Sequence, residues 1–177
     1  MSLELQLQQN IVDPKLHLEI SQFYHQEAYF LDHRMYKEWF DLLTDDVKYR
    51  MPLRVTKERR DGSDIVDEMT YFEETKKSLE TRVQRLYTNS AWVDDPPTRQ
   101  RHYITNIMIT PSAVSDEYNV RTYFFYKRSR ASELQTEEIM GEREDVIRKE
   151  EGKWKISQRT IYPDQTVLTV MNLGMFL

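Results

Sequence analysis

Hydrophobic residues near the start of the chain recur at spacings of three and four, which is the pattern of amphipathic helices. Asp13-Pro14 favours a helix start here, because Asp caps free amides and Pro needs no amide partner. The stripe that follows has one charged member and consists of Leu16, Ile20, Phe23, Tyr24, Glu27 and Leu31. Asp32 is a candidate cap for a second helix, whose apolar face consists of Met35, Tyr36, Trp39, Phe40 and Leu43.

The period then changes to two, which predicts a strand with one buried face. Its apolar positions are Val47, Tyr49, Met51, Leu53 and Val55. Pro52 cannot donate to a ladder, so it indicates an edge position or a bulge. Residues 57–68 are charged and read as a loop, and residues 73–86 are expected to form a helix.

A break at Asp94-Asp95-Pro96-Pro97 separates this part from four segments of β type, because each Pro disfavours helix for the residue before it. The segments are expected at about 99–110, 118–130, 136–149 and 153–163. Strands joined by short turns pair antiparallel. The order predicts an α+β fold in which a strongly bent sheet wraps the N-terminal helices. Residues 1–12 are expected to be a tail, and residues 13–177 one domain.

Composition excludes several classes of protein. The 177 residues carry a formal net charge of −5, which disfavours a nucleic-acid scaffold, since those are usually basic. There is no cysteine, so disulfides and thiolate-bound clusters are excluded for this sequence. No apolar run is long enough to cross a bilayer, and residues 1–10 lack the features of a signal peptide. The expected compartment is the cytoplasm, with no membrane partner.

Two constellations could carry chemistry. His25 and His33 lie eight residues apart, and Asp32 or Glu27 could complete a two-histidine, one-carboxylate iron site. Asp32 is better explained as a cap, so we expect no metal ligands and no cofactor in this chain. In the second constellation, Asp32 would orient His102 as an acid–base pair inside a cone-shaped sheet. The alternative, in which His102 bonds locally, is favoured.

The predicted strands carry aromatic and charged residues on both faces, which is typical of either a subunit interface or a solvated face with ion pairs. From strand phase, the interface candidates are Arg121, Tyr123, Arg143 and Arg159. Arg99, Arg101 and His102, with the turn at residues 94–97, are candidates for a structural polar network. Residues 167–177 are largely apolar and must pack on the chain's own core or on a neighbour.

Four segments resemble the small (β) subunits of aromatic-ring-hydroxylating dioxygenases: residues 23–32, residues 36–54, residues 92–106 and residues 172–177. The most specific begins Trp92-Val93-Asp94-Asp95-Pro96-Pro97-Thr98-Arg99-Gln100-Arg101-His102. Two departures are Arg50, where many hydrocarbon-type members have an aromatic residue, and a loop at 57–68 that is short for the biphenyl and cumene branch. The substrate branch therefore stays open between biphenyl, benzene or cumene, and polycyclic types.

The resemblance implies a cone-like α+β fold of the scytalone dehydratase and nuclear transport factor 2 type, with a mixed, mostly antiparallel sheet. It implies a structural subunit, assembled as three large and three small subunits. The large subunit would hold a Rieske 2Fe-2S cluster and a mononuclear Fe(II), and would make cis-dihydrodiols with O₂ and electrons from NADH. The alternatives are a stand-alone isomerase or dehydratase using Asp32 and His102, and a ligand-binding module without chemistry.

Overall fold

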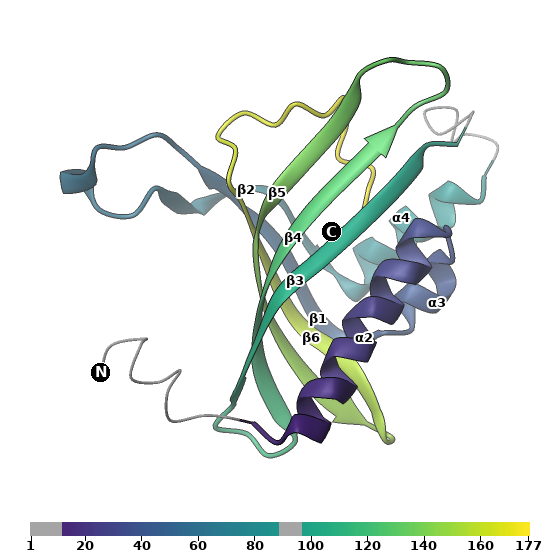
Figure 1. Cartoon of the computed structure of the whole chain (residues 1–177), viewed down its shortest axis with the longest axis vertical. Helices are drawn as coiled ribbons and strands as arrows, with labels where there is room; N and C mark the ends of the chain where they lie inside the picture. The colour runs from purple at the N-terminus through teal and green to yellow at the C-terminus, as the bar shows by residue number, and fades with distance from the viewer. Residues whose placement is uncertain (1–11, 89–96) are drawn as a thin grey trace.

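The computed structural model describes residues 12–88 and 97–177, and its elements form an α+β fold (Figure 1). In chain order they are α2 (Pro14–Asp32), α3 (Tyr36–Phe40), β1 (Leu43–Arg54), η1 (Arg59–Asp61), β2 (Ile65–Thr75), α4 (Lys76–Leu86), β3 (Arg99–Pro111), β4 (Glu117–Ser129), β5 (Thr136–Glu150) and β6 (Lys153–Pro163). The predicted tail at residues 1–12 and the turn at residues 94–97 lie almost wholly outside the described residues.

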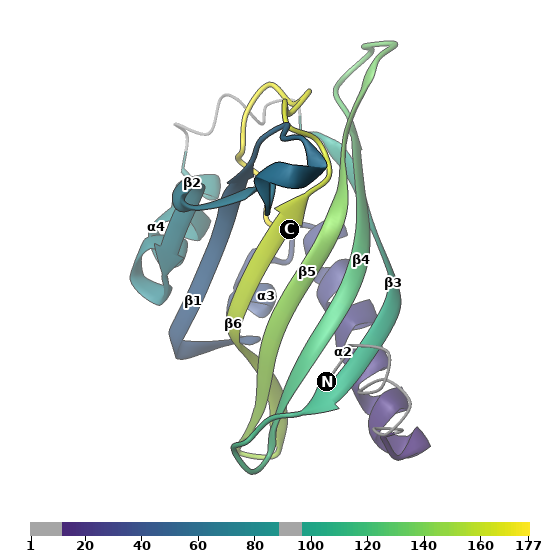
Figure 2. The ribbon, with the colours of Figure 1, turned by 90° about the vertical axis from the view of Figure 1, so that its left-hand side faces the viewer.

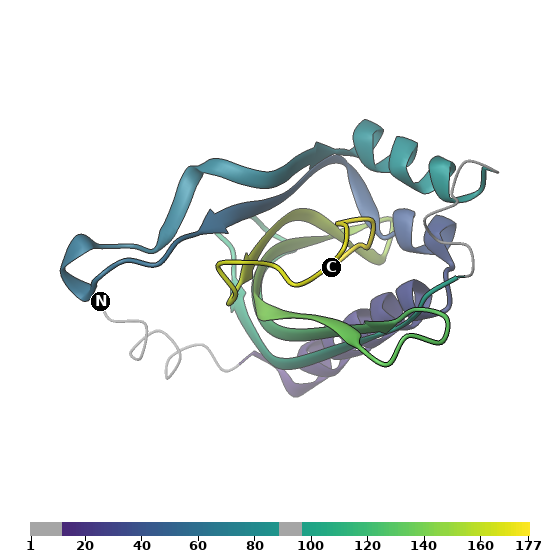
Figure 3. The same cartoon turned by 90° about the horizontal axis from the view of Figure 1, so that it is seen from above.

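The described strands form one six-stranded sheet in the order β2-β1-β6-β5-β4-β3 (Figure 2). Strand β1 pairs parallel with β6, and every other neighbouring pair is antiparallel. Seen from above, the sheet curves strongly around an interior that the helices cover on one side (Figure 3). The predicted mixed, mostly antiparallel cone is therefore confirmed.

Helix α2 begins where the sequence predicts, since Asp13 accepts a hydrogen bond from the Lys15 amide and Pro14 is its first residue. The residues of its predicted stripe that are buried are Ile20, Phe23, Tyr24, Glu27 and Leu31. Asp32 ends this helix and does not cap the next one, because the chain turns at Arg34, where φ is 58°. The second helix, α3, has Met35 at its N-cap position and no side-chain cap.

Strand β2 is the main element that the sequence analysis missed. The sequence predicts a loop through residue 68 and a helix from residue 73, but residues 65–75 form a strand, and α4 begins only at Lys76. Thr75 and Ser78 form a capping box that fixes this start. Strands β1 and β2 extend as a hairpin beyond the rest of the sheet (Figure 1). The ladder between them shifts register on both sides of Pro52, which confirms a bulge. The pairing of β1 with β6 ends at Arg50, so Pro52 also lies beyond the part of β1 that is paired on both sides.

The four strands of the C-terminal half lie within a few residues of their predicted bounds and pair as a meander. Their inward side chains share one core cluster with α2, α3 and α4. That cluster also contains Met175, Phe176 and Leu177, so the end of the apolar segment packs on the chain's own core.

Gly141 in β5 has no room for a side chain. A Cβ there would lie 2.0 Å from the Tyr162 carbonyl oxygen and 2.9 Å from the Pro163 Cα of the neighbouring strand. We therefore expect Gly141→Ala to push β5 and β6 apart and to lower the free energy of unfolding by about 1–3 kcal/mol, measured by urea titration. Glu142→Ala, at the next and outward-facing position, is the control and should change it by less than about 1 kcal/mol. Equal stability of the two variants would contradict this expectation.

Candidate functional site

The interior of the cone contains four charged side chains that no solvent reaches. Glu27 comes from α2, Arg143 and Asp145 from β5, and Arg159 from β6, and each is at most 2% exposed. Their formal charges cancel, which a buried cluster requires, because an unpaired buried charge is strongly unfavourable. The helix and two strands on opposite sides of the interior are therefore joined by ion pairs.

Arg159 is at the centre of this cluster. Its Nε and Nη2 donate to the two oxygens of Asp145 at 2.8 and 2.7 Å, and its Nη1 and Nη2 donate to the two oxygens of Glu27 at 2.5 and 3.0 Å. Two bidentate carboxylates fix the guanidinium plane, which is the strongest geometry available to such a pair. Each carboxylate accepts one further hydrogen bond from an aromatic side chain. The Trp39 indole donates to Glu27 at 3.2 Å, and the Tyr24 phenol donates to Asp145 at 2.8 Å.

Burial alone would raise the pKa of Glu27, but the charges of Arg159 and Arg143 and the hydrogen bonds from Arg159 and Trp39 outweigh it and lower that pKa below its usual 4.5. Burial raises the pKa of Tyr24 well above 10, an effect to which Asp145 adds. At neutral pH Glu27 is thus ionised and Tyr24 is a neutral donor. The cluster thus fixes the positions of its own charged side chains, and neither Glu27 nor Tyr24 is set to exchange a proton at neutral pH.

Because the pKa of Glu27 is lowered in the folded chain, the free energy of unfolding is expected to fall at acid pH. The unfolded chain takes up this proton near pH 4.5 and the folded chain only at lower pH, so the contribution of Glu27 is complete above about pH 4.5 and disappears as the pH falls further. We expect the free energy of unfolding to fall more steeply below about pH 4.5 in the natural chain than in Glu27→Gln. Urea titrations across this range test it, and parallel curves would contradict it.

The chain's own C-terminal residues occupy the space beside the cluster. Tyr49 Oη accepts from the Leu177 amide at 2.8 Å and donates to the Leu177 carbonyl oxygen at 2.6 Å, and Arg159 Nη1 reaches the same oxygen at 2.9 Å. Phe176 stacks on Trp39 with ring centroids 4.2 Å apart. The C-terminal segment crosses the opening of the cone, between sheet and helices (Figure 3).

Asp32 and His102 do come together, as one of the two sequence hypotheses required. One oxygen of Asp32 lies 2.7 Å from His102 Nδ1 and accepts from the His102 amide at 3.0 Å. The second ring nitrogen, Nε2, lies 2.9 Å from the Phe176 carbonyl oxygen. Both nitrogens therefore face atoms of the chain itself, and His102 is buried whereas the Asp32 side chain is 10% exposed. The favoured expectation of local bonding is wrong, because the partners of His102 lie 70 and 74 residues away in the chain. Of the acid–base hypothesis the structure shows the pairing alone, because no ring nitrogen of His102 is left to face a substrate.

The other histidine hypothesis fails on geometry. Glu27 points into the cone and pairs with Arg159, whereas His33 is exposed and stacks on Tyr29, with its Nδ1 2.8 Å from the Tyr29 carbonyl oxygen. Within residues 12–88 and 97–177 no three His, Cys, Asp or Glu side chains are close enough to hold a metal ion. The set of His25, His33, Asp32 and Glu27 is thus not a ligand set.

The interface candidates divide between the interior and the surface. Arg143 and Arg159 are 1% and 0% exposed, so the expectation that they lie on an open sheet face is wrong. Arg121 and Tyr123 do lie on the outer face, where Arg121 pairs with Glu144 and Glu142 of the neighbouring strand.

The expected polar network around the edge strand β3 is only partly present. Arg99 and Arg101 are exposed and donate to the Ala131 and Gln100 carbonyl oxygens. Neither arginine contacts His102 in the hydrogen bonds of the described residues. Of the three candidates on this strand, only His102 reaches the interior.

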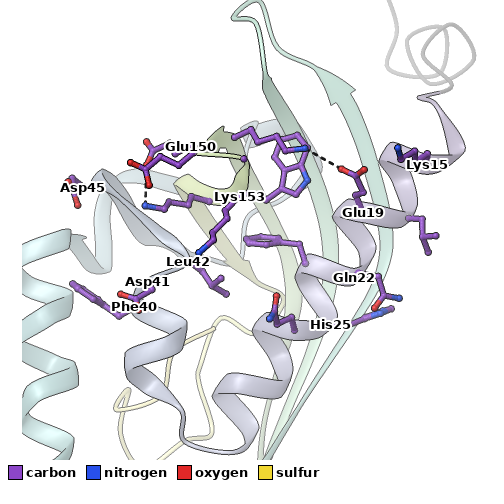
Figure 4. A pocket seen from close by; sticks show the side chains of 18 of the residues that line it. Lys15, Glu19, Gln22, His25, Phe40, Asp41, Leu42, Asp45, Glu150 and Lys153 are labelled. Carbon is purple, nitrogen blue, oxygen red and sulfur yellow. Dashed lines mark hydrogen bonds and ion pairs between the residues drawn. The ribbon is translucent and has the colours of Figure 1, made fainter.

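A groove of about 1620 Å³ runs along the outside of α2, toward the turn between β5 and β6 (Figure 4). Its apolar lining is Leu18, Phe23, Phe40, Leu42 and Trp154. Two ion pairs lie along it, Lys149 with Glu19 at 3.5 Å and Lys155 with Glu150 at 3.3 Å. It shares no lining residue with the interior ion cluster.

None of the helices in the described part of the chain is long and apolar enough to span a membrane.

Comparisons with known proteins agree with this geometry. The profile of the family described as "Ring hydroxylating beta subunit" matches residues 26–170. The chain is 35% identical over 170 residues to the biphenyl 2,3-dioxygenase subunit beta of Rhodococcus jostii, covering 93% of this chain and 90% of that protein. In a solved structure of naphthalene 1,2-dioxygenase with indole bound, a chain of 25% identity superposes with a TM-score of 0.86, covering 100% of this chain and 95% of that one.

A chain from Novosphingobium aromaticivorans assigned as a scytalone dehydratase superposes with a TM-score of 0.63 at 17% identity, covering 88% of this chain and 89% of that one. At that identity the likeness concerns the fold alone, and it confirms the cone-like architecture. Enzymes and non-enzymes share folds, so function has to be argued from the site.

Proposed function

We propose, because this chain belongs to the ring-hydroxylating beta subunit family, that it is the structural small subunit of a multicomponent aromatic-ring dioxygenase and has no catalytic site of its own. The observation that carries this proposal is the family match over residues 26–170. The interior supports it, because the Asp32–His102 pair that could have done chemistry is bonded to the chain's own Phe176.

The redox groups of such an enzyme are assigned to the large subunit. A Rieske centre is bound by two cysteines and two histidines, and this sequence contains no cysteine. The donor set of this chain thus does not fit the cluster. We place both the 2Fe-2S cluster and the mononuclear Fe(II) in the large subunit, where ring dihydroxylation by O₂ with electrons from NADH would occur. We also place the complex in the cytoplasm, with residues 13–177 acting as one domain.

The outer face of β3, β4 and β5 is our candidate for contact between small subunits. Exposed apolar side chains gather there: Tyr103, Tyr123 and Met140. Arg121 lies beside them with its partners Glu142 and Glu144. Aromatic residues and arginine are enriched at interfaces, and closed symmetry is the rule for oligomers. Three small subunits meeting through this face, each carrying one large subunit, is the assembly that we propose.

Co-purification tests the function directly. The chain carries a tag at its N-terminus, since Leu177 is buried, and is expressed with the large subunit encoded beside it. We expect a complex of about three times the combined subunit mass, with iron present only when the large subunit is present. An iron-free monomer or dimer that does not bind the large subunit would refute the proposal.

The contact face has its own test. We expect Tyr123→Ala to weaken the association of small subunits at least about fivefold, as loss of an aromatic interface contact does, and to leave turnover per iron unchanged. The yield of the full complex at a series of protein concentrations measures this effect. Tyr87→Ala is the matched control, because Tyr87 is 54% exposed, against 40% for Tyr123, and lies at the end of α4. An intact complex with reduced turnover, or an equal effect of both variants, would contradict the assignment.

A further inference from the structure

The last six residues are held in the cone in the way that a protein holds a peptide ligand. Residues 172–177 contain no helix or strand, and Met175, Phe176 and Leu177 are buried. We propose that the interior of the cone is a binding site for a short peptide with an aromatic residue followed by an aliphatic one, and that residues 172–177 of the same chain occupy it in this structure.

Side chains from five elements bind the main chain of this segment. Arg82 of α4 donates to the Leu173 and Met175 carbonyl oxygens at 2.9 and 2.7 Å. Arg128 of β4 donates to the Asn172 carbonyl oxygen at 3.1 Å, and His102 of β3 lies 2.9 Å from the Phe176 carbonyl oxygen.

Tyr49 of β1 and Arg159 of β6 bind Leu177 in the same way. Five main-chain oxygens of the segment and the Leu177 amide are thus bound by side chains of the rest of the chain rather than by a neighbouring strand. An internal loop satisfied by its own turns would need no such set of donors.

The side chain of Phe176 has a dedicated pocket. Its ring stacks on Trp39 at 4.2 Å, meets Tyr36 edge-on at 5.8 Å, and lies under the Arg82 guanidinium at 4.6 Å. An aromatic ring between another ring and a cation gains both stacking and cation–π attraction. The pocket thus selects an aromatic residue at this position, and the buried Leu177 fills the space beside Tyr49.

The connection between the segment and the sheet is comparatively open. Residues 164–171 follow β6, and Val167 and Met171 are 75% and 68% exposed. The described side-chain bonds of this connection are a long one from Tyr71 Oη to the Thr166 carbonyl oxygen, at 3.4 Å, and those of Gln165 to β5. A cut near Val167 would therefore release the segment from the chain without breaking a strand ladder.

The experiment severs that connection after folding. A protease recognition sequence is inserted after Val167, and the protein is assembled with the large subunit, purified and cut. The control is the same insertion after Leu134, in the fully exposed turn between β4 and β5. Gel filtration and mass spectrometry then measure how much of the 168–177 fragment stays with the complex. We expect retention after the first cut and an intact complex after both.

Exchange with added peptide decides whether the segment is a ligand. We expect a fluorescent synthetic peptide of residues 172–177 to replace the cut fragment, and the same peptide with the Phe176→Ala change to compete at least about 100-fold more weakly. A fragment that never exchanges would show that these residues are a permanent part of the core. A fragment that leaves while the peptide fails to bind would equally overturn the proposal.

The unaltered chain gives a second readout if the insertion prevents folding. Amide hydrogen exchange in the complex should then show that the Leu177 amide exchanges by a local opening, faster than the β5 amides that pair with β6. Equal protection of Leu177 and of those β5 amides would overturn the proposal, because it would mean that the segment opens only with the whole fold.

Discussion

Replacement of Arg159 by methionine is expected to lower the free energy of unfolding by about 3–5 kcal/mol, because removal of one partner from a buried ion pair leaves the other charge uncompensated. Arg159 is fully buried and bonds both oxygens of Glu27 and both oxygens of Asp145. Methionine keeps most of the side-chain volume, so the loss reports the charge rather than a cavity. Urea titration of the isolated chain at neutral pH measures the effect.

Two further variants sharpen this test. Arg121→Met removes an arginine whose carboxylate partners are on the surface, and should change stability by about 1 kcal/mol or less. Arg159→Met alone leaves the buried carboxylates of Glu27 and Asp145 without their cation, and adding Glu27→Gln removes one of these two charges. The double variant should therefore be more stable than the sum of the two single losses in free energy predicts. Strict additivity, or equal effects of Arg159→Met and Arg121→Met, would show that the cluster does not act as a unit.

Replacement of Phe176 by alanine is expected to have an effect of similar size, about 3–5 kcal/mol, through a cavity. The ring is 2% exposed and contacts Trp39 and Tyr36 of α3 and Arg82 of α4. Removal of the ring leaves Trp39, Tyr36 and Arg82 without this packing partner, since a close-packed interior collapses only partly around a cavity. Thermal and urea unfolding of the isolated chain measure the loss.

Phe176→Leu is the informative comparison, because it keeps an apolar side chain but removes stacking and cation–π attraction. It should be destabilised less than Phe176→Ala. Met171→Ala, only a few residues earlier but exposed, should be close to neutral. If Phe176→Ala proved as harmless as Met171→Ala, the segment would not be packed in solution as it is in this structure.

Much of the fold could be predicted from the sequence because its signals are local. Asp13-Pro14 and an apolar stripe predicted α2, period-two alternation predicted β1, and four segments of β type between short turns predicted β3 to β6. Strand β2 gave no such signal, because most of it lies in or near the extended hairpin and it has no fully buried face. Alternation reports burial, so a strand exposed on both faces cannot be recognised by it.

The interior site was harder to predict, and the reason lies in how charge was interpreted. Arg143 and Asp145 are in phase with the buried Ile139 and Ile147 of β5, yet their charge suggested a wet or contacting face. The sequence did contain one signal of the interior site: Glu27 is a carboxylate within an apolar stripe. A buried carboxylate needs a buried cation as its partner. The Asp32–His102 pair was anticipated, but only the structure shows that Phe176 closes it off.

The parallel pairing of β1 with β6 joins positions more than a hundred residues apart, such as Leu43 and Ile156. During synthesis, the first helix and strand leave the ribosome long before the strand that lies beside them. The ring of Trp39 in α3, which stacks on Phe176, must therefore wait for the last residues of the chain before it is covered. Pairings of such long range form slowly, and exposed apolar surface favours aggregation in the meantime. Folding of the nascent chain thus depends on prompt completion of its C-terminal strand.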